Sequence, residues 1–343
     1  MKSESGGSLR DLPADDRATV LDSLISLVTQ FLPSAGLPEP HFLFLDNSIL
    51  QDLLKREVHR TSALRTRAVL LFADFLVHHS QLRVEVALPP AILYEFAQRV
   101  VPHSESEWIV VTRNAHQCLL ILGMPIRSFG ASSFAEGRAV LSDIVHDESV
   151  IAGAVSAIKV KDWTVALRDG SRMTMPLPLS YRLVPQELKL KYFDLTCVRA
   201  ILASLIERRI LENRQNDAHV RRTFRNKDVG VLGSLNRLKK GVLQGLGDIE
   251  LLAACSTNRQ FQQRQDHTCT ALSFDETLNR ALALHKSRMA THEPIQMGDD
   301  SSEEIRRKFA ELSDGIAHLN KVAERQDAFG HRVAQFIEAQ DWG

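Results

Sequence analysis

The chain has 343 residues, of which 44% are hydrophobic and 24% charged, and its 42 basic and 42 acidic side chains give no formal net charge. This composition is typical of a globular protein with one large or two medium-sized domains, and it excludes a polycation that binds nucleic acid over its whole surface. The cysteines form no CxxC pair, the first residues hold no apolar signal core, and no apolar run approaches the roughly 20 residues of a membrane span. We therefore expect a reduced, cytoplasmic protein without a membrane segment.

Residues 1–37 are predicted to form an N-terminal tail and an amphipathic helix over 15–32. In the stretch HFLFLDNSIL that follows, a short apolar run over 42–45 leads directly into Asp46 and then into a helical pattern. Such a run is typical of a strand that is buried on both faces in a parallel sheet. We expect Asp46 to lie at the carboxyl end of this strand, where open α/β sheets bind ligands.

A longer amphipathic helix is predicted over 61–79, a second strand over 83–88, and a helix over 91–101 that carries Glu95 and begins after two prolines. Basic side chains gather around the start of the first of these helices. We interpret them as a solvated face, made of Arg56, Arg60, Arg65 and Arg67.

The middle of the chain, residues 104–155, is predicted to be helical or mixed. Its acidic cluster is interpreted as a solvated surface and comprises Asp143, Asp147 and Glu148. Residues 156–178 alternate apolar and polar side chains on both sides of an Asp-Gly pair, which favours a β-hairpin or a small meander. A further helix is predicted over 194–211.

The segment 221–240 is strongly basic and contains one acid, Asp228. A patch of this sign gains affinity for phosphate backbones by releasing counterions. The basic side chains that would contact nucleic acid are Arg221, Arg222, Arg225, Lys227, Arg237, Lys239 and Lys240. An exposed loop and helix with ordinary positive charge is the alternative.

Two further acids stand at the junctions of predicted elements. Asp248 opens the helix DIELLAACS, where the helix dipole and unpaired amides favour a carboxylate. The segment TCTALSF is β-compatible and ends in Asp275, after which a helical pattern begins. The arrangement at Asp46 therefore recurs near the other end of the chain.

Residues 301–343 are predicted to form a helical tail. Apolar side chains with heptad spacing mark one face of its first half, at Ile305, Phe309, Leu312, Ile316 and Leu319. The pattern continues less regularly through Val322, Phe329, Val333 and Phe336. This face packs against another copy, against a protein partner, or back on its own domain, and the sequence leaves the three open.

The four acids and their contexts resemble the PIN-domain nucleases. The matching stretches are FLDNS around Asp46, VALPPAILYEFAQ around Glu95, GDIELLAACS around Asp248, and ALSFDETL around Asp275. Ser273 occupies the small-hydroxyl position before the last acid. The four acids agree with that family in their order, in the type of element that carries each, and in their local context. The resemblance covers residues 38–100 and 235–290.

The resemblance implies an α/β fold with a PIN-like parallel sheet flanked by helices. The PIN-like domain would be divided into a first part, 38–103, and a second part, 221–292, that includes the basic segment. Because the stretch between the second and third acids is longer than a compact PIN fold needs, 104–220 would be an inserted subdomain with the hairpin and a helix. The C-terminal helix would follow over 301–343.

Four carboxylates at one site repel one another and raise each other's pKa, so they are stable together mainly when a hard divalent cation neutralises them. Such a cation polarises a phosphate and lowers the pKa of a bound water. We assign as direct or water-mediated ligands of Mg²⁺ or Mn²⁺ the acids Asp46, Glu95, Asp248 and Asp275. Asn47 and Ser273 are expected to orient them.

The resulting hypothesis is a metal-dependent endoribonuclease, with RNA rather than DNA implied by the resemblance alone. A toxin, an RNA-processing factor and an antiviral effector would all share these features. The alternative is a PIN-like scaffold that binds RNA or protein without cutting, and the presence of all four acids argues against it. Glu250 and Glu276 are weaker candidates, because adjacent helix positions point in different directions. No HExxH, GxSxG or metal-finger spacing supports another chemistry.

Overall fold

The computed structural model describes residues 9–127, 133–156, 161–166, 172–177, 185–192, 238–239, 242–243, 245–255, 266–275, 278–279, 282, 302–340 and 342. In this part of the chain a three-stranded parallel sheet is flanked by helices, so the fold is mixed α/β, as predicted. The predicted helix over 194–211 lies outside the described residues. Among the helices that are described, none has the length and apolar character required to cross a membrane.

The sheet consists of β1 (His41–Leu45), β2 (Val84–Ala87) and β7 (Thr268–Leu272), in the order β2-β1-β7. The central strand, β1, pairs in parallel with both neighbours. Its residues are buried along almost the whole strand, which explains why its sequence is continuously apolar rather than alternating. Because the strands are parallel, the residues that follow them emerge at one common edge of the sheet.

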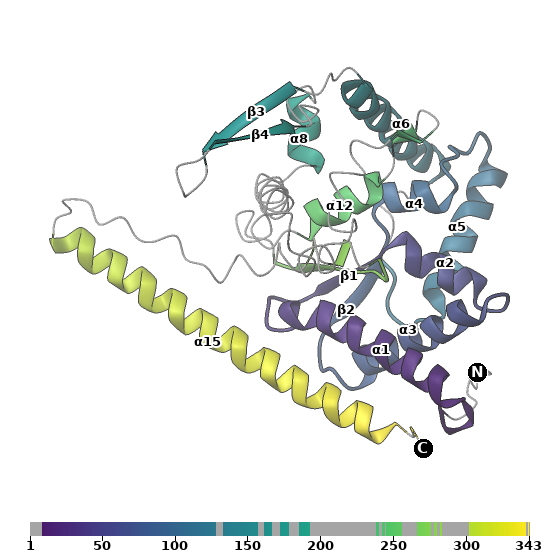
Figure 1. Cartoon of the computed structure of the whole chain (residues 1–343). Coiled ribbons are helices and arrows are strands. Elements are labelled where there is room, and N and C mark those ends of the chain that lie inside the picture. The colour runs from purple at the N-terminus through teal and green to yellow at the C-terminus, as the bar shows by residue number, and fades with distance from the viewer. Residues whose placement is uncertain are drawn as a thin grey trace.

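Helices pack around the sheet in the described part of the chain (Figure 1). Helices α1 (Ala14–Phe31) and α3 (Arg60–His78) pack against each other, and α1 also contacts β7. Helices α2 (Asn47–Lys55) and α4 (Pro90–Phe96) follow β1 and β2 in the chain, and they contact each other. Helix α12 (Leu246–Ala254) contacts both α4 and β7. The elements that carry the predicted acids are therefore neighbours.

Helix α4 ends at Phe96, earlier than the predicted end at 101. The physical reason is a change of backbone conformation, since Gln98 and Arg99 have positive φ angles of 57° and 62°. Left-handed residues cannot continue a right-handed helix.

The remaining elements are η1 (Leu9–Asp11), η2 (Leu32–Ser34), α5 (Glu105–Leu120), α6 (Phe134–Ser156), β3 (Lys161–Ala166), β4 (Arg172–Leu177), α8 (Gln186–Tyr192), β5 (Leu238–Lys239), β6 (Val242–Leu243) and α15 (Ser302–Ala339). Strands β3 and β4 pair antiparallel, which confirms the hairpin predicted over 156–178. The Asp-Gly pair that predicted its turn lies outside the described residues.

The acidic cluster of α6 corrects a prediction. Asp147 and Glu148 are buried, at 6% and 8% exposure, although Asp143 is exposed as expected. Lys191 Nζ lies 2.6 Å from Asp147 Oδ2, and Arg99 Nη1 lies 2.6 Å from Glu148 Oε1. The solvated-surface interpretation is wrong for these two acids because basic partners distant in sequence allow them to be buried.

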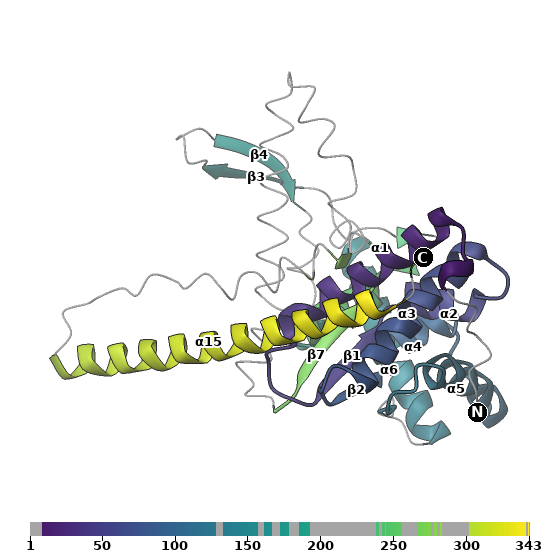
Figure 2. The ribbon, with the colours of Figure 1, turned by 90° about the horizontal axis from the view of Figure 1, so that it is seen from below.

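The second half of α15 packs against the domain. Phe329 is fully buried and its ring lies 5.4 Å from that of Phe31 and 5.3 Å from that of Phe75. The ring of Phe336 lies 5.3 Å from that of Phe75. Figures 1 and 2 show the first half of the helix extending beyond the sheet and its helices. Of the three open possibilities for the tail, packing on its own domain holds for the second half.

Candidate carboxylate site

The edge of the sheet where β1 and β7 end brings Asp46 and Ser273 together. Leu45 pairs with Leu272 as the last residues of the two strands. The backbone N–H of Asp46 then donates to the Leu272 carbonyl at 3.0 Å, so the parallel pairing continues one step past the strand. Asp46 therefore lies at the carboxyl end of a buried strand, as its sequence context indicated.

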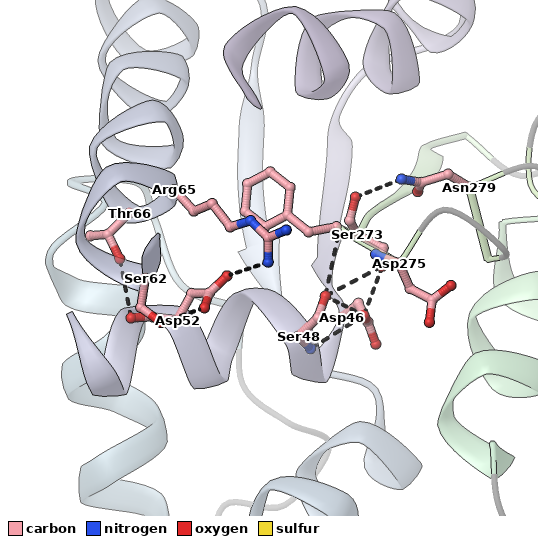
Figure 3. Close-up of polar contacts among 10 residues, drawn as sticks. Asp46, Ser48, Asp52, Ser62, Arg65, Thr66, Ser273, Asp275 and Asn279 are labelled. Atoms are coloured by element: carbon pink, nitrogen blue, oxygen red, sulfur yellow. Dashed lines mark hydrogen bonds and ion pairs between the residues drawn. The ribbon is translucent and has the colours of Figure 1, made fainter. Parts of the chain in front are cut away.

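Three hydrogen bonds fix the Asp46 carboxylate, and all of them reach Oδ2 (Figure 3). Ser48 donates from its backbone N–H at 3.2 Å and from its hydroxyl at 2.6 Å. The Ser273 hydroxyl donates at 2.7 Å. Between described residues, no hydrogen bond goes to Oδ1. Asp46 is 4% exposed, so its carboxylate is held in one orientation within the fold.

Ser48 also orients Asp46, a role that was not predicted from the sequence. Its hydroxyl also accepts a hydrogen bond from the Phe274 N–H at 3.2 Å, which ties the start of α2 to the end of β7. Asn47 was expected to orient the acids, yet its side chain accepts from Gln51 at 3.5 Å. The signal for Ser48 was its position two residues after Asp46, where an N-cap carboxylate accepts a local hydrogen bond.

Ser273 is held from both sides of its backbone. The Gln30 side chain accepts from the Ser273 N–H at 2.8 Å and donates to its carbonyl at 3.0 Å, and Asn279 donates to the same carbonyl at 2.8 Å. The Ser273 hydroxyl accepts from the Asp275 N–H at 2.9 Å. Asp275 is exposed, and its Oδ1 accepts from the Leu278 N–H at 3.1 Å. Ser273 thus links Asp46 to Asp275.

Glu95 and Asp248 come from the two helices that meet beside this edge. The Gly247 N–H donates to Glu95 Oε1 at 3.2 Å. A β-carbon on Gly247 would lie 2.6 Å from Ile92 Cδ1 and 3.0 Å from Glu95 Oε2, so any side chain here would displace Ile92 or Glu95. The residue before Asp248 is therefore part of the site.

Glu250 joins the same two helices at another point. Its Oε2 accepts a hydrogen bond from the Ala91 N–H at 2.7 Å, in the first turn of α4, where no backbone carbonyl can reach. Burial raises the pKa of Glu250 to about 7. Glu250 positions α4 on α12 and supplies a cap that no local sequence pattern predicts.

The electrostatics of Asp248 link all four acids. Burial raises the pKa of Asp248 well above its ordinary value, and the negative charges of Asp46, Glu95 and Asp275 raise it further. No hydrogen bond from another described residue reaches its carboxylate. Asp46, Glu95 and Asp275 lie far from Asp248 in the sequence but are close enough to it in the fold to disfavour its ionisation.

Both acidic and basic neighbours act on the pKa of Glu95. Burial is the largest cause of its raised pKa, and the charges of Asp46 and Glu148 act in the same direction. The Gly247 N–H and the Arg99 guanidinium oppose them. A basic partner therefore already stands on one side of the carboxylate site.

The donor set fits a hard divalent cation, because carboxylate oxygens are its preferred ligands and the charges acting on Asp248 are all negative. In the described part of the chain, no three His, Cys, Asp or Glu side chains are arranged to hold a metal ion as they stand. Asp46, Glu95, Asp248 and Asp275 would hold it. Water-mediated contacts are compatible with this looser arrangement, since Mg²⁺ usually retains several waters.

The predicted basic face at the start of α3 is engaged in contacts. Arg60 Nη2 forms an ion pair with Asp16 Oδ1 at 2.8 Å, and Arg65 Nη1 lies 3.5 Å from Asp52 Oδ2. The Arg65 guanidinium also lies 5.1 Å from the centroid of the Phe274 ring, next to the carboxylate site (Figure 3). Arg60 is 72% exposed at its side chain, which agrees with the solvated-face interpretation, whereas Arg65 is 39% exposed and packs beside Phe274.

The other predicted site residues lie outside the described residues or are described by their backbone alone. Outside the described residues are Arg221, Arg222, Arg225, Lys227, Arg237, Lys240 and Glu276. Lys239 lies in β5, of which only the backbone is described. The nucleic-acid contact of this segment stays a prediction. Comparisons of the chain with protein-family models, with curated proteins and with solved structures found no match.

Proposed function

We propose that this protein is a metal-dependent phosphodiesterase of PIN type that cleaves RNA, with Mg²⁺ or Mn²⁺ held by Asp46, Glu95, Asp248 and Asp275. The observation that carries the proposal is the pair of contacts that brings the acids to one place: Ser273 donates to Asp46 where β1 and β7 end, and Gly247, next to Asp248, donates to Glu95 where α12 meets α4. Burial and the charges of the other three acids also raise the pKa of Asp248. Carboxylates gathered at one partly buried site cost stability unless a cation neutralises them. A chain that retains such a group gains from binding that cation.

The bound cation would neutralise the scissile phosphate and lower the pKa of an attacking water. The chain's own part is to hold the ligands. Ser48 and Ser273 fix one oxygen of Asp46. Gly247, the residue before Asp248, holds Glu95 by a hydrogen bond from its backbone N–H to Oε1. Asp275 is exposed and would be the ligand most accessible to solvent.

RNA cleavage should be tested with labelled single-stranded RNA, structured RNA and DNA, in Mn²⁺, Mg²⁺ or EDTA. The informative comparison is wild type with Asp46→Asn, and Asp74→Asn serves as the matched control because Asp74 is an exposed acid on α3, 53% accessible at its side chain. We expect metal-dependent cleavage in wild type and in the control, and at least ~100-fold slower cleavage in Asp46→Asn. Equal cleavage by Asp46→Asn would refute the assignment. Absence of cleavage and of Mn²⁺ binding in wild type would favour a non-cutting scaffold.

A further inference from the structure

Arg99 occupies an unusual place beside the carboxylate site. It follows α4 directly, in a left-handed backbone conformation with φ of 62°, after Gln98 in a similar conformation. Its N–H donates to the Tyr94 carbonyl at 2.8 Å, which folds the chain back over the end of α4. Left-handed conformations cost energy for residues other than glycine and persist only where the surroundings determine them.

The side chain of Arg99 bridges two acids. Its Nη1 donates to Glu148 Oε1 at 2.6 Å, whereas its Nη2 lies 3.5 Å from Glu95 Oε1. Glu148 is itself fixed, because the Tyr94 hydroxyl donates to its Oε2 at 3.2 Å. The Arg99 side chain is 23% exposed, so these contacts form in a partly desolvated setting where they are stronger than in water.

The two contacts differ in strength. The short, charge-assisted bond to Glu148 anchors Arg99, and the long contact to Glu95 is weak by comparison. This ion pair joins a basic side chain to one of the four acids. The contact with Glu95 can break while the bond to Glu148 still keeps the guanidinium at the site.

An anionic phosphodiester approaching four carboxylates is repelled, so a cation fixed beside them would favour its binding. Arginine suits this task because its planar guanidinium presents five donors and pairs with phosphate in bidentate geometry. We propose, on the basis of the proposed nuclease function, that Arg99 is the phosphate-binding residue of the carboxylate site. With no metal bound it is the counter-ion of Glu95; once a divalent cation engages Glu95, Arg99 stays on Glu148 and binds a phosphate oxygen of the substrate.

This proposal predicts opposite changes in two measurements on Arg99→Gln. Mn²⁺ affinity, measured by titration calorimetry without substrate, should rise about 3- to 10-fold, because a positive charge near Glu95 is removed. Cleavage of a labelled single-stranded RNA at saturating Mn²⁺ should fall at least ~30-fold, because the phosphate loses its partner. A purely structural role for Arg99 would weaken both together. Arg99→Lys should restore the wild-type Mn²⁺ affinity but only part of the cleavage.

Glu148→Gln provides a second, independent variant. In this variant Arg99 loses its bond to Glu148 and should pair more closely with Glu95. The Mn²⁺ affinity of Glu148→Gln should therefore fall below that of wild type, whereas the Mn²⁺ affinity of Arg99→Gln should rise above it. Arg83→Gln is the matched control, since Arg83 is 71% exposed and precedes β2 at the opposite edge of the sheet. It should change neither measurement, and thermal melting of each variant checks folding.

Two results for Arg99→Gln would overturn the role of Arg99. In the first, Mn²⁺ affinity and cleavage both stay within twofold of wild type; in the second, both are reduced. If Asp46→Asn still abolished Mn²⁺ binding in that case, the proposed function would stand without this residue. Wild-type protein that neither binds Mn²⁺ nor cuts RNA would overturn both.

Discussion

The backbone N–H of Gly247 donates a hydrogen bond to Glu95 Oε1 at 3.2 Å, across 152 positions of sequence. This bond joins α12 to α4 at the point where the two helices carry their acids. It also explains why a glycine precedes Asp248, because any larger residue would collide with Ile92 and Glu95. The geometry of half of the carboxylate site therefore depends on a residue without a side chain.

Gly247→Ala should displace Glu95 and destabilise the protein by about 1–3 kcal/mol, because the new methyl group overpacks the contact between the helices. Chemical denaturation measures the free energy of unfolding. Gly330→Ala is the control, since nothing lies within 4 Å of its added β-carbon in α15, and it should stabilise by about 0.5–1 kcal/mol. Similar effects of the two substitutions would contradict the close approach of α12 and α4.

Glu250→Ala should cost about 1–3 kcal/mol of stability, because the Ala91 N–H at the start of α4 loses its acceptor. Glu250→Gln should retain most of that stability, since an amide oxygen can accept the same bond. Denaturation curves of the two variants at pH 8 make the comparison. Equal losses would show that the carboxylate charge, rather than the cap, is what matters.

Asp248→Asn should raise the melting temperature of the metal-free protein in EDTA at neutral pH. The folded-state pKa of Asp248 lies above its ordinary value of 3.8, so the unfolded chain ionises first as pH rises, and wild-type stability falls through that range. Asparagine does not titrate, so the advantage of the variant should grow from pH 4 to pH 8. A melting-temperature difference independent of pH would contradict the burial and charge coupling of this acid.

His41 should make the protein acid-sensitive. It is fully buried on β1, neither ring nitrogen has a hydrogen-bond partner among the described residues, and burial lowers its pKa from 6.5 to about 4. The unfolded chain therefore binds a proton first as pH falls, and stability drops between pH 6.5 and 4 by up to roughly 3 kcal/mol. His41→Leu should lose this part of the pH dependence in denaturation at pH 7, 5.5 and 4.5. An unchanged slope would show that His41 gains a partner.

Phe329→Ala should destabilise the whole domain by about 3–5 kcal/mol, because its ring is fully buried between α1 and α3. Gln335→Ala, at an exposed position of the same helix, should have little effect. Thermal melting followed by circular dichroism compares the two. A Phe329→Ala protein that melts like wild type would mean that α15 is not part of the core.

Local patterns gave the strands and the junctions of the site, because burial and capping act on neighbouring residues. The apolar run before Asp46 predicted a buried parallel strand, and the structure has β1 there with its acid at the carboxyl end. The same reasoning misjudged Asp147 and Glu148, whose basic partners come from α8 and from the turn after α4. Partners this distant leave no local trace.

The amino-acid sequence by itself determined which side chains are available at the ends of its strands and helices: Asp46 after β1, Ser273 after β7, and Asp248 in the first turn of α12. Only the tertiary structure decided which of them meet. Parallel pairing of β1 with β7 brings Ser273 to Asp46 across 227 positions, and the packing of α12 on α4 brings Asp248 toward Glu95. Such contacts form because the whole core excludes water at once, and no short segment encodes them.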